Sequence, residues 1–232
     1  VQWNEGGWPP ITAGAGPSAS AASPFQAAAR REERTFFDDF SAPELKPGWQ
    51  WPQGQEPLIR IEAEPGSRLV LGPAPDQARD LIGAVAAIKT TVGSYTATTL
   101  VEIEGLPAGA MAGLAAFGDR ENALGLSVGG SKLTVWRRQK NKHDDLTTGV
   151  SLDATRLHLR MTAIDGHRFR FAISEDGRTW KKVSEDIDVE GKYLPPWDRG
   201  VRVALTVGGA EGATAKFDWL RIEPAAAKVN SK

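Results

Sequence analysis

Residues 155–174, TRLHLRMTAIDGHRFRFAIS, hold two runs in which apolar and polar side chains alternate. On an extended chain, alternate side chains point to one face, so each run has an apolar face. These apolar residues are Leu157, Leu159, Met161 and Ala163 in the first run, and Phe169, Phe171 and Ile173 in the second. Asp165-Gly166, between the runs, is a pair that tight hairpin turns prefer. The stretch therefore predicts two antiparallel strands that share one buried face.

The same pattern continues through the chain from Thr35 onward. Short alternating runs are separated by Gly, Pro and Asp at intervals of roughly 8–12 residues. No segment keeps a 3.6-residue apolar period over three turns. Many short strands without helices between them predict an all-β fold, either an antiparallel two-sheet sandwich or a barrel.

Composition excludes several classes of protein. The 232 residues are 41% hydrophobic, which is enough for a core, and the net charge of −1 gives no basic surface for nucleic acid or an anionic membrane. No apolar run reaches the roughly 18 residues of a membrane helix. Cysteine is absent, so disulfides, thiolate zinc sites and cysteine nucleophiles are excluded. The three histidines, His143, His158 and His167, lack metal-ligand spacing, and we expect them on the surface.

The chain divides into four segments by composition. Residues 1–11, VQWNEGGWPPI, precede an Ala-, Ser-, Gly- and Pro-rich stretch, residues 12–34, which is typical of a linker. Residues 35–224 form the predicted β domain, and residues 225–232 form a short tail.

No residue in the sequence is nominated for catalysis. Adjacent carboxylates occur at 32–33, 38–39 and 144–145, but neighbours on a strand point to opposite faces. Such pairs cannot flank one glycosidic bond. Motifs for a serine nucleophile, a zinc hydrolase, a phosphate loop or a dinucleotide are absent.

A sugar-binding surface is predicted around KLTVWRR. Leu133 and Val135 share one face of this strand, and Thr134, Trp136 and Arg138 share the other. If the first pair faces the core, Trp136 and Arg138 face water. An exposed indole covers the apolar face of a sugar ring, and the guanidinium beside it binds hydroxyls.

Four further residues complete the predicted sugar site. Trp49 and Trp51 are two residues apart, so on a strand their side chains share one face. The other two residues are Arg120 and Asn122, in the stretch GDRENALGLSV. Packing in the core or at its rim is the alternative for the tryptophans, because large aromatics are usually mostly buried.

Acidic residues near the two ends of the β domain predict a calcium site. If the first and last strands pair, Asp38 or Asp39 comes close to Asp218. Two carboxylates with carbonyls and water supply the oxygen ligands that Ca²⁺ needs. The alternative is that these acids cap turns or pair with Arg221.

Four motifs in this order resemble a known family: FFDDF…LKPGWQWPQGQEP, YTATTLVEIEGLPAGAMAGLAAFGDRENALGLSV, FRFAISEDGRTWKKV and KFDWLRIEP. The sequence from about Thr35 to Pro224 is similar to the C-terminal concanavalin A-like β-sandwich of β-xylosidases and arabinofuranosidases of glycoside hydrolase family 43. The resemblance implies a jelly-roll sandwich beside a five-bladed propeller catalytic domain. It also implies a structural calcium, with Asp39 and Asp218 in the matching DDF and FDW motifs.

The first eleven residues resemble the closing strand of that propeller, so Trp3 and Trp8 are expected to pack in a catalytic domain that this chain mostly lacks. The propeller's catalytic acids have no counterpart here, and a further alternative is that the chain is one piece of a longer enzyme.

The resemblance implies an accessory, carbohydrate-binding module of a plant-polysaccharide glycoside hydrolase. Such a module positions xylan- or arabinan-type chains, or completes and stabilises the catalytic domain. An autonomous lectin-like module and a structural protein-interaction sandwich without sugar affinity are the alternatives. The expected location is secreted or periplasmic in a bacterium.

Overall fold

The computed structural model describes residues 35–63, 66–147, 150–183, 188–195 and 200–225. These residues belong to a unit that begins at Arg34. The predicted propeller strand, the predicted linker and all of the predicted tail except Ala225 lie outside the described residues.

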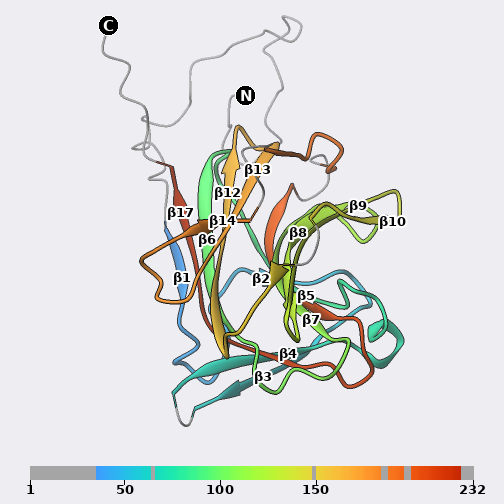
Figure 1. Ribbon diagram of the computed structural model, residues 1–232, viewed down its shortest axis with the longest axis vertical. Coiled ribbons are helices and arrows are strands. Elements are labelled where there is room, and N and C mark those ends of the chain that lie inside the picture. Colours follow the sequence, from blue (N-terminus) through green and yellow to red (C-terminus); the bar gives the residue numbers. More distant parts are fainter. Residues whose placement is uncertain (1–34, 64–65, 148–149, 184–187, 196–199, 226–232) are drawn as a thin grey trace, which may run out of the picture. The chain divides into compact units, whose positions relative to one another are not determined.

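A nine-stranded sheet is built around β6 (Tyr95–Glu102), which pairs with β12 (Arg156–Ile164) on one side and β17 (Ala215–Pro224) on the other (Figure 1). Its order is β14-β13-β12-β6-β17-β4-β3, and β1 pairs with β17 and β15 with β13. The other strands of this sheet are β1 (Phe36–Asp38), β3 (Leu58–Glu62), β4 (Arg68–Gly72), β13 (Arg168–Ser174), β14 (Lys181–Lys182) and β15 (Val189–Glu190).

The second sheet has six strands in the order β10-β9-β8-β7-β16, with β11 paired to β9. Its strands are β7 (Met111–Phe117), β8 (Ala123–Gly129), β9 (Lys132–Gln139), β10 (Lys142–Asp145), β11 (Val150–Ser151) and β16 (Arg202–Gly208). A pair formed by β2 (Trp49–Gln50) and β5 (Ala84–Lys89) lies beside it, because a bridge from Gly83 to Val207 joins the start of β5 to β16. The single helix of the described residues is a 3-10 turn, η1 (Pro75–Gln77), and it is far too short to cross a membrane.

The predicted hairpin of residues 155–174 is confirmed, with β12 and β13 paired so that Met161 faces Phe171. Their apolar side chains join those of the six-stranded sheet in one continuous buried cluster. Two antiparallel sheets with a shared core confirm the predicted sandwich and exclude the barrel.

The six-stranded sheet is buried on both faces. Leu133 and Val135 of β9 point into the shared core, whereas Trp136 belongs to a second apolar cluster on the opposite, outer face. The other members of this outer cluster are Ile82, Val85, Ala87, Ala115, Phe117, Ala123 and Ala204. This outer face is where the candidate site lies.

Candidate functional site

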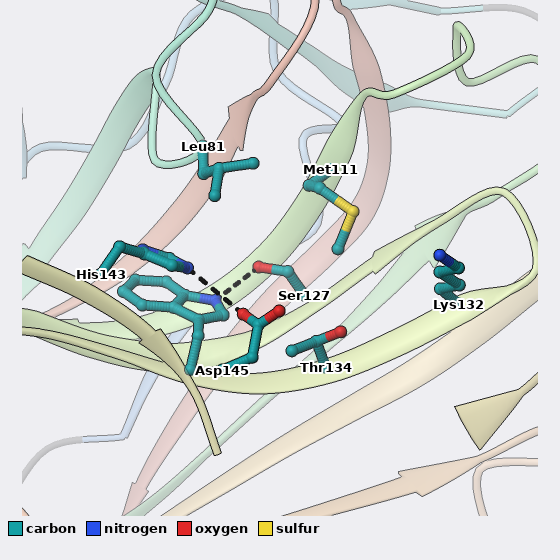
Figure 2. Close-up of a pocket in the computed structure, with 8 residues that line it drawn as sticks. Leu81, Met111, Ser127, Lys132, Thr134, His143 and Asp145 are labelled. Atoms are coloured by element: carbon teal, nitrogen blue, oxygen red, sulfur yellow. Dashed lines mark hydrogen bonds and ion pairs between the residues drawn. The ribbon is translucent and has the colours of Figure 1, made fainter. Parts of the chain in front are cut away.

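A pocket of about 160 Å³ lies on the outer face of the six-stranded sheet. Figure 2 shows Leu81 and Met111 on one side of it, Thr134 and Asp145 on the other, and Ser127 between them. Eight side chains from β7, β8, β9, β10 and the segment before β5 line it: Leu81, Met111, Ser127, Lys132, Thr134, Trp136, His143 and Asp145. The pocket therefore has an apolar side and a polar side.

The indole of Trp136 is one of the side chains that line this pocket. Its Nε1 donates a hydrogen bond of 2.8 Å to Oγ of Ser127. The ring packs over Gly125, its cross-strand partner on β8, where an added Cβ would lie 2.8 Å from the indole Cζ2. The His143 ring stacks on the indole with centroids 5.4 Å apart. With both faces covered, Trp136 is only 3% exposed.

A tight turn brings the polar residues to the pocket. The two residues at 140–141 both have positive φ, as a two-residue hairpin requires, and they join β9 to β10. The resulting register places His143 opposite Arg138 and Asp145 opposite Trp136. Because directly opposed residues share a face, both side chains point to the outer face of the sheet.

The imidazole of His143 lies close to Asp145, with 3.5 Å between Nε2 and Oδ1. Burial lowers the pKa of His143, and the positive charge of Arg138 lowers it further, so the ring is neutral at pH 7. The Asp145 side chain is 63% exposed. Its carboxylate therefore keeps acceptor capacity for another partner.

Leu81 is held over the pocket by a close backbone contact. Gly83 has φ +50°, and a Cβ there would lie 2.2 Å from the Val207 carbonyl oxygen, so no other residue fits without a shift of the backbone. The carbonyl of Asp80 accepts a hydrogen bond of 2.9 Å from the N–H of Gly209. These contacts fix residues 80–83 against the end of β16.

Arg138 ties the same segment to β9. Its two terminal nitrogens donate to the two carboxylate oxygens of Asp80 at 2.9 and 2.6 Å. Burial tends to raise the pKa of Asp80, but the hydrogen bonds from Arg138 and the Ile82 N–H, together with the positive charges nearby, outweigh it and the net pKa is lowered. Arg138 is thus a positioning residue for the segment that carries Leu81.

The predicted exposure of Trp136 and Arg138 is wrong, since they are 3% and 8% exposed. Their predicted orientation, away from Leu133 and Val135, is confirmed. The discrepancy arises because residues 80–83 and the His143 ring cover this face. A sugar contact by Trp136 or Arg138 stays a prediction.

Trp49 packs at the rim of the core, which is the alternative that the sequence left open. Its Nε1 donates to Oδ2 of Asp38 at 2.8 Å, and its ring meets Phe36 edge-on and Phe40 at a tilt. Trp51 is half-buried just after β2. Neither tryptophan lines the pocket over Trp136.

Arg120 and Asn122 lie at the turn between β7 and β8. The Arg120 guanidinium donates a hydrogen bond to Oε1 of Gln55. The backbone carbonyl of Arg120 accepts a hydrogen bond of 3.4 Å from the Arg138 guanidinium. The amide of Asn122 donates to Asp119 and accepts from the N–H of Lys140. Both predicted residues order the sheet beside the pocket rather than line it.

The two acids predicted to bind calcium have other partners in the structure, and the calcium site stays a prediction. Asp39 accepts hydrogen bonds from the N–H and hydroxyl of Ser41, so it caps a turn as the alternative stated. Asp218 pairs with Arg156 and Arg68, not with Arg221. In the described ranges no group of three or more acidic, histidine or cysteine side chains is arranged to hold a metal.

Ser127, His143 and Asp145 line one pocket, but they do not form a catalytic triad. The Ser127 hydroxyl accepts its hydrogen bond from Trp136, and the structure shows no hydrogen bond from Ser127 to His143. A triad requires the histidine to bond to the serine oxygen. The pocket is suited to binding a ligand through the Thr134 hydroxyl, the Asp145 carboxylate and the Lys132 ammonium group.

Sequence reasoning missed most of the pocket residues and placed His143 on the surface. One signal was available, because QKNK between two alternating runs is compatible with a two-residue turn that tolerates positive φ at Asn141. That turn fixes the register and places His143 and Asp145 on the face of Trp136.

Solved structures similar in fold to this chain include proteins described as GH43. A xylan β-1,4-xylosidase of Bacillus halodurans C-125 has 19% identity and a TM-score of 0.68, covering 88% of this chain and 41% of its own. A Bacteroides ovatus xyloglucan PUL GH43B protein has 18% identity and a TM-score of 0.67, with coverages of 87% and 42%. The chain thus spans about two fifths of these proteins. No curated protein matches it.

The family comparison covers the whole sandwich. The sequence model of the β-xylosidase C-terminal concanavalin A-like domain matches residues 37–223, from β1 to the end of β17. Two packed antiparallel sheets agree with that fold. The chain therefore belongs to the family of C-terminal concanavalin A-like domains found in β-xylosidases of glycoside hydrolase family 43.

Proposed function

We propose that this chain works as the accessory module of a glycoside hydrolase of family 43. In this role it holds a plant-polysaccharide chain of the xylan or arabinan type and completes a propeller catalytic domain. The family match over residues 37–223 carries the proposal. The relatives support the substrate class, since one is described as a xylan β-1,4-xylosidase.

The chemistry of the described residues supports binding rather than hydrolysis by the sandwich itself. Retaining and inverting glycosidases need two carboxyl groups on opposite sides of the scissile bond. Asp80 and Asp218 pair with arginines, and Asp38 accepts hydrogen bonds from the backbone and from Trp49. Asp145 has free acceptor capacity, but no second carboxylate is among the described residues that line its pocket. We therefore assign bond cleavage to a separate catalytic domain.

A hydrolysis assay tests this division of labour. The purified chain is incubated with aryl β-xyloside and aryl α-arabinofuranoside, in parallel with the native polypeptide isolated from its source, whose intact mass is measured. We expect turnover only from a polypeptide heavier than this chain. Turnover by the 232-residue chain alone would contradict the proposal.

A further inference from the structure

The size of the pocket over Trp136 restricts what it can hold. Clefts for drug-sized ligands usually measure roughly 300–1,000 Å³. This pocket measures about 160 Å³. It therefore matches one small ring and not several rings of a chain.

The polar groups of the pocket match a neutral polyol. The Asp145 carboxylate accepts hydrogen bonds only, the Lys132 ammonium donates only, and the Thr134 hydroxyl does both. Among the described residues, the side chains of Lys132 and Thr134 have no hydrogen-bond or ion-pair partner. With His143 neutral, one negative and one positive side chain line the pocket, so its charges balance.

The apolar side of the pocket matches the C–H groups of such a ring. Leu81 and Met111 lie across from Thr134 and Asp145 in Figure 2. Leu81 is 40% exposed, so part of its surface is free for contact. A sugar ring has hydroxyls at its edge and C–H groups on its faces, and it can satisfy both sides at once.

We propose that this pocket binds one neutral pentose ring, at the end or at a branch of an oligosaccharide. The Asp145 carboxylate accepts hydrogen bonds from ring hydroxyls, Lys132 donates to a ring oxygen, and Leu81 and Met111 cover the C–H face. His143 is a positioning residue, because its ring lies on Trp136 and beside Asp145. The inference rests on the proposed function, from which the pentose class is taken, and assigns a site to it.

A titration followed by nuclear magnetic resonance tests the pocket. The full ¹⁵N-labelled chain is titrated with methyl β-xyloside and methyl α-arabinofuranoside, and methyl β-glucoside serves as the hexose comparison. The reporter is the indole N–H signal of Trp136, assigned by its loss in Trp136→Phe. We expect a saturable shift with at least one pentoside and weaker binding of the glucoside.

Variants on one strand separate the pocket from general charge effects. Asp145→Asn should weaken pentoside binding roughly 10- to 100-fold, the range for loss of a hydrogen bond to a charged group. Asp144→Asn is the matched control, because Asp144 lies next along β10 and pairs with Arg137 and Lys142 instead. It should bind like the wild type. Lys132→Met, at another exposed position of the pocket, should also weaken binding.

Three results would overturn the pentose pocket. They are an unchanged Trp136 signal with both pentosides, an Asp145→Asn affinity equal to that of the wild type, and equal binding of the glucoside. Calorimetry with xylotriose separates this failure from failure of the proposed function. Wild-type affinity for xylotriose in Asp145→Asn would place sugar binding elsewhere on the sandwich, whereas no binding in the wild type would remove substrate binding from the function as well.

Discussion

On the nine-stranded sheet, the face turned away from the core carries ion pairs and half-buried aromatic rings that lie under arginines, whereas the corresponding face of the six-stranded sheet carries a buried apolar cluster. Asp218 on the first face pairs with Arg156 and Arg68, and Arg68 also pairs with Glu102 at 2.7 Å. On the second face, Trp136 packs over Gly125 beneath a histidine. A charged face is stable in water without a cover, but an apolar face has to be covered by protein or ligand.

This difference locates the pocket that we propose as the sugar site. The chain's own residues 80–83 and His143 cover the outer face of the six-stranded sheet only in part, and the pocket lies where their cover ends.

The largest effect is expected from removal of the buried indole. Trp136→Ala should lower the free energy of unfolding by about 3–5 kcal/mol, because it leaves a cavity in the outer cluster. Trp180→Ala is the comparison on the outer face of the other sheet. The Trp180 ring is half-buried, and the guanidinium carbon of Arg160 lies 3.5 Å from its ring centroid. The loss of this cation–π contact should lower the free energy of unfolding by about 0.5–1 kcal/mol. Urea denaturation measures both. Equal losses would mean that the two faces are equally buried.

Loss of the Asp80 charge should have the next largest effect. Asp80→Asn should lower the free energy of unfolding by about 2–3 kcal/mol, because Arg138, 8% exposed, is left with an uncompensated charge. Glu211→Gln breaks a pair with the same shortest distance, Arg79–Glu211 at 2.6 Å, in which both side chains are exposed. That control should leave stability nearly unchanged. A harmless Asp80→Asn would show that Arg138 does not hold the segment over the pocket.

The pH dependence of stability should report the burial of His143. Burial lowers the pKa of this residue in the folded chain, so the unfolded chain binds the proton first as pH falls. The stability that neutral His143 provides is present above about pH 6.5 and is lost as pH falls towards the lowered pKa. Melting temperatures between pH 7.5 and 5 should therefore fall less steeply in His143→Gln. An identical slope in the variant would indicate that His143 is solvated.

The smallest effect is expected from a chelator. Asp39 caps a turn and Asp218 is paired with arginines, so removal of divalent ions should not shift the melting temperature. Differential scanning calorimetry with and without EDTA measures this. A clear decrease in EDTA would support the calcium site predicted from the sequence, and it would mean that the ion pairs of this face rearrange around the ion.

Much of the sandwich could be predicted from alternation alone. The two sides of β9 and of the β12–β13 hairpin were assigned correctly, because one face of each strand is strongly apolar. Such a pattern tells which side chains share a face, but it does not tell what covers that face. For Trp136 part of the cover comes from His143 on the next strand, and the rest comes from residues 80–83, more than fifty positions earlier in the chain.

That cover depends on contacts between distant parts of the sequence. Gly83 and Gly208 let the segment of Asp80 lie directly against β16, and Arg138 then reaches Asp80. A single sequence contains no signal that pairs these glycines. Local reasoning therefore took Trp136 and Arg138 as exposed sugar contacts, while the structure places the accessible groups on β10 and at the start of β9.

Isothermal titration of the full chain with xylo- and arabino-oligosaccharides tests the central claim most directly. We predict heat that saturates with at least one of the two pentose series and is reduced in Asp145→Asn. Absence of heat across both series would contradict a sugar-holding role and would leave the sandwich only the part of completing and stabilising its catalytic domain.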